Sequence, residues 1–228
     1  MKVIKIRFNK ILVATASALI TLTLLASVAQ AACTDQPPLI YLDWHGCSLV
    51  NANLANANLI NANLVGANLK GANLTGAMLV GAGLNYVNLS SAILTSAILV
   101  RPDLTGANLT SANLAGANLS GAVLISASLS NANLTGANLT SAYLASANLT
   151  GASLVKASLI KADLGANLTS ANLTGANLMG ANLTGANLTG ANLTGADLTG
   201  ANLKLVRFDT TTITAQGVHC ESSTKCSW

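Results

Sequence analysis

The chain has 228 residues, of which 51% are hydrophobic, 3% aromatic and 8% charged. Its net charge of +4 comes from 11 basic and 7 acidic residues, but four of the basic ones lie in the first ten positions. The remainder carries seven of each, so it has no basic stripe of the kind that binds nucleic acid.

Residues 1–31 have the features of a secretory signal peptide. A basic start is followed by an apolar run over 11–29, and Ala29-Gln30-Ala31 forms an A-x-A cleavage site. We predict cleavage after Ala31 and export to the periplasm or the cell exterior, with no stable membrane insertion afterwards. The alternative is an uncleaved membrane anchor, because the run approaches the length that spans a bilayer.

Residues 32–48 are predicted to form an N-terminal cap that contains Cys33 and Cys47. Leu39 and Trp44 stand at five-residue steps before Leu49. The periodic register is therefore expected to start before the repeat itself is recognisable.

Residues 49–203 are a repeat of five residues. Leucine occupies every fifth position from Leu49 to Leu164, the next leucine comes one residue early at Leu168, and the rhythm then continues to Leu203. A step of five scatters side chains around a helix and alternates them between the two faces of a straight strand. Only a chain that turns a corner in every repeat keeps all the leucines in one core.

The run ANLTGANLTGANLTGADLTGANL over 181–203 resembles the pentapeptide-repeat proteins, whose pattern is A(D/N)LXX, and the resemblance extends over residues 39–213. It implies an all-β fold, a right-handed quadrilateral parallel β-helix with four repeats per coil. The regular leucines then make about eight coils, a rod about 40 Å long at the usual strand spacing. Leucine and the alanine two residues before it are expected to point inward, with Cys47, Val87 and Pro102 in alanine positions.

Residues 204–228 are predicted to form a C-terminal cap. Phe208 and Ile213 continue the five-residue step and are expected to seal the core, and Cys220 and Cys226 follow. Because the rod implied by the resemblance separates its ends by far more than a disulfide spans, we expect the pairs Cys33–Cys47 and Cys220–Cys226. Free thiols are the alternative.

Two irregularities interrupt the repeat. Pro102 occupies an inward position and lacks a backbone N–H group. The missing residue after Leu164 is expected to cause a local bulge or small bend, with Gly165 supplying an unusual backbone angle.

The residues offer no catalytic, cofactor or metal site. The two histidines, His45 and His219, lie in opposite caps, and Asp43 near His45 has no suitable nucleophile beside it. Asp103, Asp163 and Asp197 are isolated replacements of asparagine that we expect to be solvated. We therefore predict a protein that is not an enzyme and uses no cofactor.

Specific function is expected where outward residues depart from the repeat. If residues 20 positions apart stack on one another, several outward apolar residues form a patch on the second and third coils, and Tyr86 and Val87 lie near it. A second column of varied residues, on the next face, contains Tyr143. Random drift is the alternative. The candidate partner surface is Met78, Val80, Ile93, Ile98, Val100 and Tyr143.

The sequence thus favours a non-catalytic exported rod that binds a protein partner or a second copy and no nucleic acid. One alternative is ice or surface binding through flat threonine-rich faces, such as the column of Thr135, Thr174 and Thr194. Some members of the family mimic DNA and bind gyrase, but export and neutral charge disfavour that function here.

Overall fold

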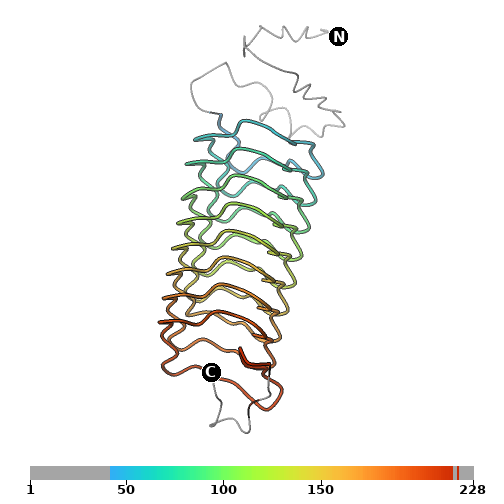
Figure 1. Ribbon diagram of the computed structural model, residues 1–228. Coiled ribbons are helices and arrows are strands. Elements are labelled where there is room, and N and C mark those ends of the chain that lie inside the picture. Colours follow the sequence, from blue (N-terminus) through green and yellow to red (C-terminus); the bar gives the residue numbers. More distant parts are fainter. Residues whose placement is uncertain (1–41, 218–219, 221–228) are drawn as a thin grey trace, which may run out of the picture.

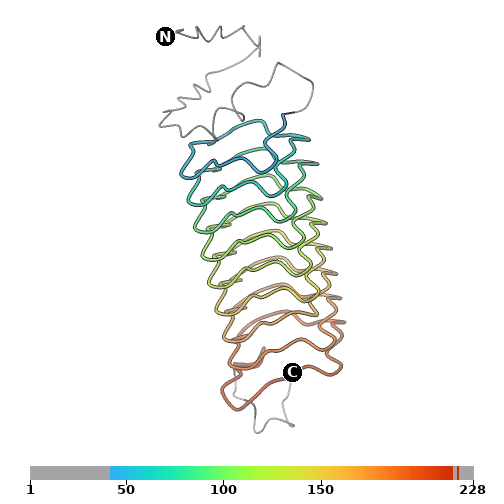
Figure 2. The same ribbon diagram turned by 180° about the vertical axis from the view of Figure 1, so that it is seen from behind.

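The computed structural model describes residues 42–217 and residue 220. This part of the chain is a slender stack of coils with its two ends at opposite ends of the stack (Figures 1 and 2). It contains no helix and no continuous strand; instead, one residue of each pentapeptide forms an isolated parallel bridge to a residue usually 20 positions further on. The predicted four-sided parallel β-helix is confirmed.

The bridges form four columns, and each column defines one face of the rod. Face 1 runs through Asp43, Asn63, Gly83, Asp103, Val123, Tyr143, Asp163, Asn182 and Asn202. Face 2 runs through Ser48, Asn68, Asn88, Asn108, Ser128, Asn148, Asn167, Asn187 and Arg207. Face 3 runs through Asn53, Asn73, Ile93, Asn113, Asn133, Ser153, Asn172, Asn192 and Ile213. Face 4 runs through Asn58, Met78, Ile98, Asn118, Asn138, Ser158, Asn177 and Asp197.

The core consists of the leucine that follows each bridge residue and the alanine that precedes it. Leucines from Leu54 to Leu193 are at most 2% exposed, and most alanines are equally buried. Each buried leucine contributes about 2 kcal/mol to the hydrophobic free energy of folding. Val87 and Pro102 are buried in alanine positions, and so is Cys47, as predicted.

Each corner is a tight turn closed by one backbone hydrogen bond. The alanine N–H donates to the leucine carbonyl three residues earlier, for example from Ala112 to Leu109 at 3.0 Å. The residue before that alanine, here Ser111, has a positive φ of 57°. A positive φ at the third residue is the requirement of a type II turn, which explains why glycine, asparagine and serine fill most of these positions. We call this residue, two after the leucine, the corner residue, and the one after the leucine the following residue.

Asparagine recurs at the bridge because its side chain organises the next turn. The Asn148 Oδ1 atom accepts a hydrogen bond from the Thr150 backbone N–H at 3.1 Å and from the Thr150 hydroxyl at 2.7 Å. Side-chain amides also link successive coils, as from Asn88 Nδ2 to Asn68 Oδ1 at 3.1 Å. These bonds give the bridge position a structural preference for asparagine or aspartate.

The missing residue after Leu164 removes a corner residue, and the winding continues beyond it. Ala166 N–H donates to the Leu164 carbonyl only two residues earlier, and bridges across the site connect residues 19 apart. Gly165 has no positive φ, so the prediction that it supplies an unusual angle is wrong. The corner lacks the residue that would have required a positive φ. Because that residue would also have donated its N–H to the next coil, no described backbone N–H donates to the Thr184 carbonyl.

Pro102 loosens the pairing around it without stopping the winding. The Leu84 N–H to Asp103 carbonyl distance is 3.1 Å, against 2.7 Å for the next bond in the series, from Leu89 to Asn108. The bonds expected from Asp103 to Ala82 and from Gly81 to Val100 are absent among the described residues. Proline therefore lacks a backbone N–H donor of its own and also separates neighbouring donors from their acceptors.

The register extends beyond the repeat at both ends. Asp43 already bridges to Asn63, and the half-buried Trp44 packs against the core. At the other end an extra residue between Arg207 and Ile213 places Ile213 in a bridge with Asn192, so its side chain is not the inward one. The prediction that Ile213 seals the core is wrong: Thr212 and Thr214 are the buried residues there, and the Thr212 hydroxyl donates to the Leu188 carbonyl at 3.0 Å.

Several predictions concern residues outside the described part of the chain. These are the signal peptide over 1–31, the position of Leu39, and the residues Cys33, His219 and Cys226.

Candidate functional site

The departures from the repeat gather on face 4, on the second and third of the bridged coils. Met78 forms a bridge with Ile98, and Val80 and Val100 are the following residues of the same two coils. Ile60 precedes Val80 in that column and is 43% exposed. We call these five residues, Ile60, Met78, Val80, Ile98 and Val100, the face-4 patch. Its side chains are half-buried or exposed and uncharged.

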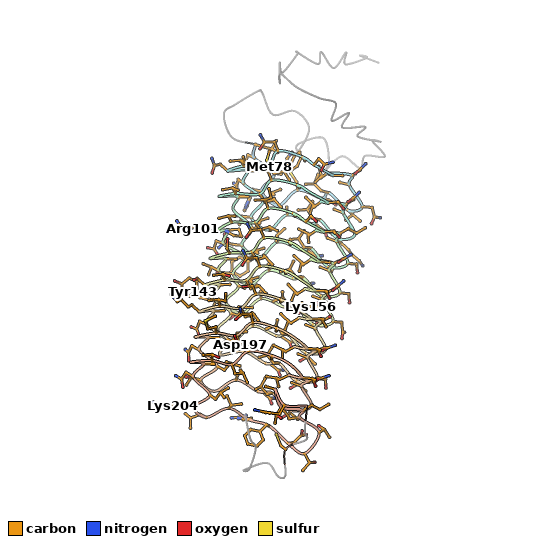
Figure 3. The ribbon with its side chains drawn as sticks, viewed as in Figure 1. Met78, Arg101, Tyr143, Lys156, Asp197 and Lys204 are labelled. Atoms are coloured by element: carbon orange, nitrogen blue, oxygen red, sulfur yellow. The ribbon has the colours of Figure 1, made fainter. Side chains whose placement is uncertain are left out.

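Ile93 and Tyr143 lie on the two faces that adjoin face 4. Figure 3 shows Met78 and Asp197 on the side that faces the viewer, Arg101 and Tyr143 along one edge, and Lys156 along the other. Ile93 belongs to face 3, one corner away from the patch. Tyr143 belongs to face 1 and lies two coils further along, so the structure does not bring it into the face-4 patch.

Val87 does not belong to any surface. It fills an inward alanine position and is fully buried, so its predicted contribution to an apolar surface patch is wrong. Tyr86, the residue before it, is 69% exposed at the corner between faces 1 and 2. The sharp turn between these two residues directs the Val87 side chain into the core and the Tyr86 side chain into solvent.

A second apolar group surrounds Tyr143 on face 1. Val123 is bridged to Tyr143, and Ile125 is the following residue of Val123 and is 40% exposed. Ala145 is the following residue of Tyr143. We call Val123, Ile125, Tyr143 and Ala145 the face-1 block. Sequence reasoning missed Ile125 because β-branched residues are common at that position, and only its column and coil reveal its neighbours.

Large side chains at corner positions are a further departure. Tyr86, Arg101, Lys156, Lys161 and Leu205 all have φ between 53° and 57°. This left-handed conformation costs a residue other than glycine about 1–2 kcal/mol. Such strain marks positions where the side chain is retained for another reason.

The aspartates replace asparagine in its structural role instead of being simply solvated. Asp103 Oδ1 accepts hydrogen bonds from the Thr105 N–H at 3.0 Å and the Thr105 hydroxyl at 2.6 Å, and Asn85 Nδ2 donates to Asp103 Oδ2 at 2.6 Å. Partial burial acts to raise the pKa of Asp103, but these hydrogen bonds outweigh it and lower the pKa. Hydrogen bonds from Thr199 likewise lower the pKa of Asp197.

The described residues contain no group of three or more histidine, cysteine, aspartate or glutamate side chains able to hold a metal ion. His45 is exposed, and its backbone N–H donates to Asp43 Oδ1 at 3.1 Å. Cys47 and Cys220 are buried near opposite ends of the rod, and neither is a free thiol. Within the same residues no helix has the length and apolarity to cross a bilayer.

Face 2 presents an array that the sequence reasoning did not single out. Its following residues bear hydroxyl groups in consecutive coils, Ser90, Thr110, Ser130, Thr150, Thr169 and Thr189. The column predicted from Thr135, Thr174 and Thr194 exists on face 3 but is interrupted by Val155. The first four residues of the face-2 column are spaced by 20 and could have been found in the sequence. The deletion near Gly165 places Thr169 and Thr189 one residue earlier than that spacing predicts.

Comparisons with known proteins agree with this geometry. The family model for pentapeptide repeats matches residues 47–85, 103–140, 132–165 and 166–204. A search of curated proteins finds no significant match.

Several solved structures are similar. The chain is 48% identical to the pentapeptide repeat protein Rfr23 from the cyanobacterium Cyanothece 51142 over 40% of its own length and 62% of that chain, with a TM-score of 0.39. It is 36% identical to HetL from Nostoc sp. strain PCC 7120, a protein involved in heterocyst differentiation regulation, over 79% and 91% of the two chains, with a TM-score of 0.33. It is 21% identical to full-length QnrB1, a plasmid-mediated fluoroquinolone resistance protein, over 74% and 89%, with a TM-score of 0.46.

The matched segments cover most of the rod, and the bridges, corners and buried leucines follow the same five-residue unit. The chain therefore belongs to the pentapeptide-repeat family and folds as its right-handed quadrilateral β-helix.

Proposed function

We propose that this protein is an exported, non-catalytic rod that binds another protein through the face-4 patch, with Ile93 at its border. The observation that carries the proposal is the contiguity of the patch. Met78 and Ile98 are bridged, and Val80 and Val100 follow them in the same two coils. Grouped exposed apolar side chains on a rigid surface are typical of protein contacts.

Export is supported by the N-terminal segment and by the cysteines. Residues 1–31 carry the charge, apolar run and A-x-A site of a signal peptide. Disulfides persist in oxidising compartments, and we propose the pairs Cys33–Cys47 and Cys220–Cys226, which would close the two ends of the core. The place of action would be the periplasm or the cell exterior.

The described faces of the rod offer side chains for binding and no cluster of catalytic or metal-binding groups. The described faces consist mainly of asparagine, serine and threonine whose side chains already bond to the turns. DNA mimicry is not favoured, because the bridge columns carry asparagine where a mimic needs repeated acidic residues.

The decisive test compares the protein with two double variants that restore the repeat's own residue. Met78→Asn with Ile98→Asn removes the centre of the face-4 patch, and Ser158→Asn with Asp197→Asn changes the same face away from it. Cross-linking in intact cells, followed by capture, should yield a defined partner with the native protein and the second variant but not with the first. Equal recovery by all three would refute the role of the patch.

Export is tested separately by cell fractionation and by the mass of the mature chain. We expect the protein in an exported fraction, starting at Ala32. A full-length chain in the cytoplasm would overturn export while leaving the binding role of the patch open to the first test.

The hydroxyl column of face 2 favours a second candidate, binding to an ordered water layer or a crystalline surface. The hydroxyls of Thr150, Thr169 and Thr189 each donate to the preceding asparagine at 2.6–2.7 Å, which orients the side chains alike. Their repeat is the coil spacing of about 4.8 Å. Thermal hysteresis that is lost in Thr150→Lys but kept in the patch variant would establish this function, and its absence would remove it.

A further inference from the structure

We infer that face 1 is a self-association surface on which two copies lie side by side and parallel, related by a two-fold axis along the rods. This inference does not depend on export or on the partner of face 4. It assigns a use to the face-1 block and to the large corner residues.

The face-1 block has the layout of an interface centre. Val123, Ile125 and Tyr143 provide the apolar middle, and Tyr143 is 52% exposed. Asp103 lies one coil before the block and Asp163 one coil after it. An apolar centre with charged residues only at its margin is the usual anatomy of a protein interface.

The strained corners point to the same face. Of the five large corner residues, Tyr86 and Leu205 lie at the corner between faces 1 and 2, and Arg101 and Lys161 at the corner between faces 4 and 1. Only Lys156 lies elsewhere. Side chains that keep an unfavourable backbone angle along both borders of one face suggest a common purpose there.

A parallel two-fold arrangement opposes residues of complementary size. Each coil then meets the same coil of its partner, so the bridge residue of one copy faces the following residue of the other. Tyr143 meets the partner's Ala145, and Val123 meets the partner's Ile125. Asp103 meets the partner's Thr105, and Asp163 meets the partner's Gly165, so neither carboxylate faces a charged group.

The corners are complementary in the same arrangement. The backbone of each large corner residue on face 1 is level with a glycine of the partner: Tyr86 with Gly81 of the partner subunit, Arg101 with Gly106 of the partner subunit, and Leu205 with Gly200 of the partner subunit. Lys161 faces the shortened corner at 165–166. The ring of Tyr86 lies over Gly106 in its own chain, so it is level with the backbone of the partner's Arg101, whose side chain leans toward the next coil over Gly121 and leaves room for the ring.

Charge decides against the opposite orientation. An antiparallel pair that places the face-1 block on itself brings Asp103 against the partner's Asp163 and Arg101 against the partner's Lys161. Both contacts join like charges. The parallel pair contains no such contact.

The parallel pair can also use the whole length of the face. The block alone occupies two coils, about 10 Å along the rod, so the area it could bury is far below the roughly 1,000 Å² that a specific interface needs. Because matching coils meet throughout, pairing continues from Asn63 to Asn202. Both face-4 patches then lie at the same end of the dimer, which would let one partner engage two patches.

Sedimentation of the purified protein over a range of concentrations tests association. We expect a reversible dimer whose dissociation constant rises at least about tenfold in Val123→Asn with Tyr143→Asn. These substitutions install the repeat's own residue, so the fold should persist, and thermal unfolding checks that it does. The matched control, Met78→Asn with Ile98→Asn, should dimerise like the native protein. A native protein that stays monomeric, or a control that dissociates while the face-1 variant does not, overturns the inference.

Orientation is tested with spin labels on Thr199→Cys, an exposed position on face 4 with the native disulfides intact. A parallel dimer places the two labels at the same height along the rod. An antiparallel dimer centred on the block would separate them by roughly 30 Å along the rod. The labels should therefore be separated only by the width of the pair, and the additional axial separation would refute the parallel arrangement.

Discussion

The aromatic ring of Tyr86 lies over Gly106 of the next coil, where a Cβ atom would stand 2.6 Å from the Tyr86 Cε1 atom. The same relationship recurs at other corners: the Arg101 side chain lies over Gly121, and Asn131 lies over Gly151. A corner side chain in the left-handed conformation thus leans toward the C-terminal end, and glycine in the next coil leaves room for it.

Replacement of Gly106 by alanine tests this relationship. Gly106→Ala should cost about 1–2 kcal/mol for the positive φ, plus the contact of Tyr86, which has to rotate away. Gly136→Ala is the matched control, because Gly136 has the same φ of 66° and nothing within 4 Å of an added Cβ. Urea unfolding should rank Gly106→Ala as the less stable variant, and equal midpoints would show that the Tyr86 contact contributes nothing.

Leucines in the middle of the stack should matter more than those at its end. Leu114 is completely buried, whereas Leu203, in the last regular coil, is only half-buried. Leu114→Ala should lower the free energy of unfolding by about 3 kcal/mol, and Leu203→Ala by about 1 kcal/mol or less. Denaturant unfolding measures both, and similar losses would contradict the distribution of burial described above.

Restoring the missing corner residue should stabilise the rod. A glycine inserted between Gly165 and Ala166 would supply an N–H group for the Thr184 carbonyl and return the Ala166 turn to its usual length. We expect a gain of about 1 kcal/mol in the free energy of unfolding. The same insertion after Thr150, in a regular coil, should destabilise the protein, and a loss at both sites would show that the short corner is already relaxed.

Acid should weaken the rod through the aspartates that organise turns. Hydrogen bonds lower the pKa of Asp103, Asp197 and Asp209 in the folded state, although partial burial opposes the effect at Asp103. A lowered folded-state pKa adds stability that is complete above the unfolded-state pKa of about 3.9 and is lost as the pH falls through the folded-state value. The free energy of unfolding should be level above about pH 5 and decline below about pH 4.

Asp103→Asn provides the control for the acid effect. Asparagine keeps an acceptor for the Thr105 N–H and hydroxyl but does not titrate between pH 2 and 7. The variant should therefore lose less stability between pH 5 and pH 2 than the native protein, as measured by urea midpoints. An unchanged acid profile would mean that Asp103 does not contribute to it.

Much of the fold followed from spacing alone. The five-residue step from Leu49 to Leu164 excludes a helix and a straight strand, and the inward alanine, leucine, Val87 and Pro102 positions follow from it. The prediction for Ile213 was wrong because the step was extended past an insertion, where Thr212 and Asp209 form a loop that no leucine marks. Gly165 was misjudged because a deletion can remove a strained residue instead of creating one.

The sequence by itself determined that the chain turns a corner in every repeat, because a period of five keeps leucine and alanine inward in no other way, and its resemblance to pentapeptide-repeat proteins implied four corners per coil, with which the family model agrees. It also located the variable faces, since a 20-residue coil places Met78 beside Ile98 and Val123 beside Tyr143. Only the tertiary structure decided which way the corner side chains lean and that Asp103 organises a turn. The lean depends on contacts between residues in successive coils, and the role of Asp103 depends on where its side chain meets Thr105, neither of which the spacing of the repeat records.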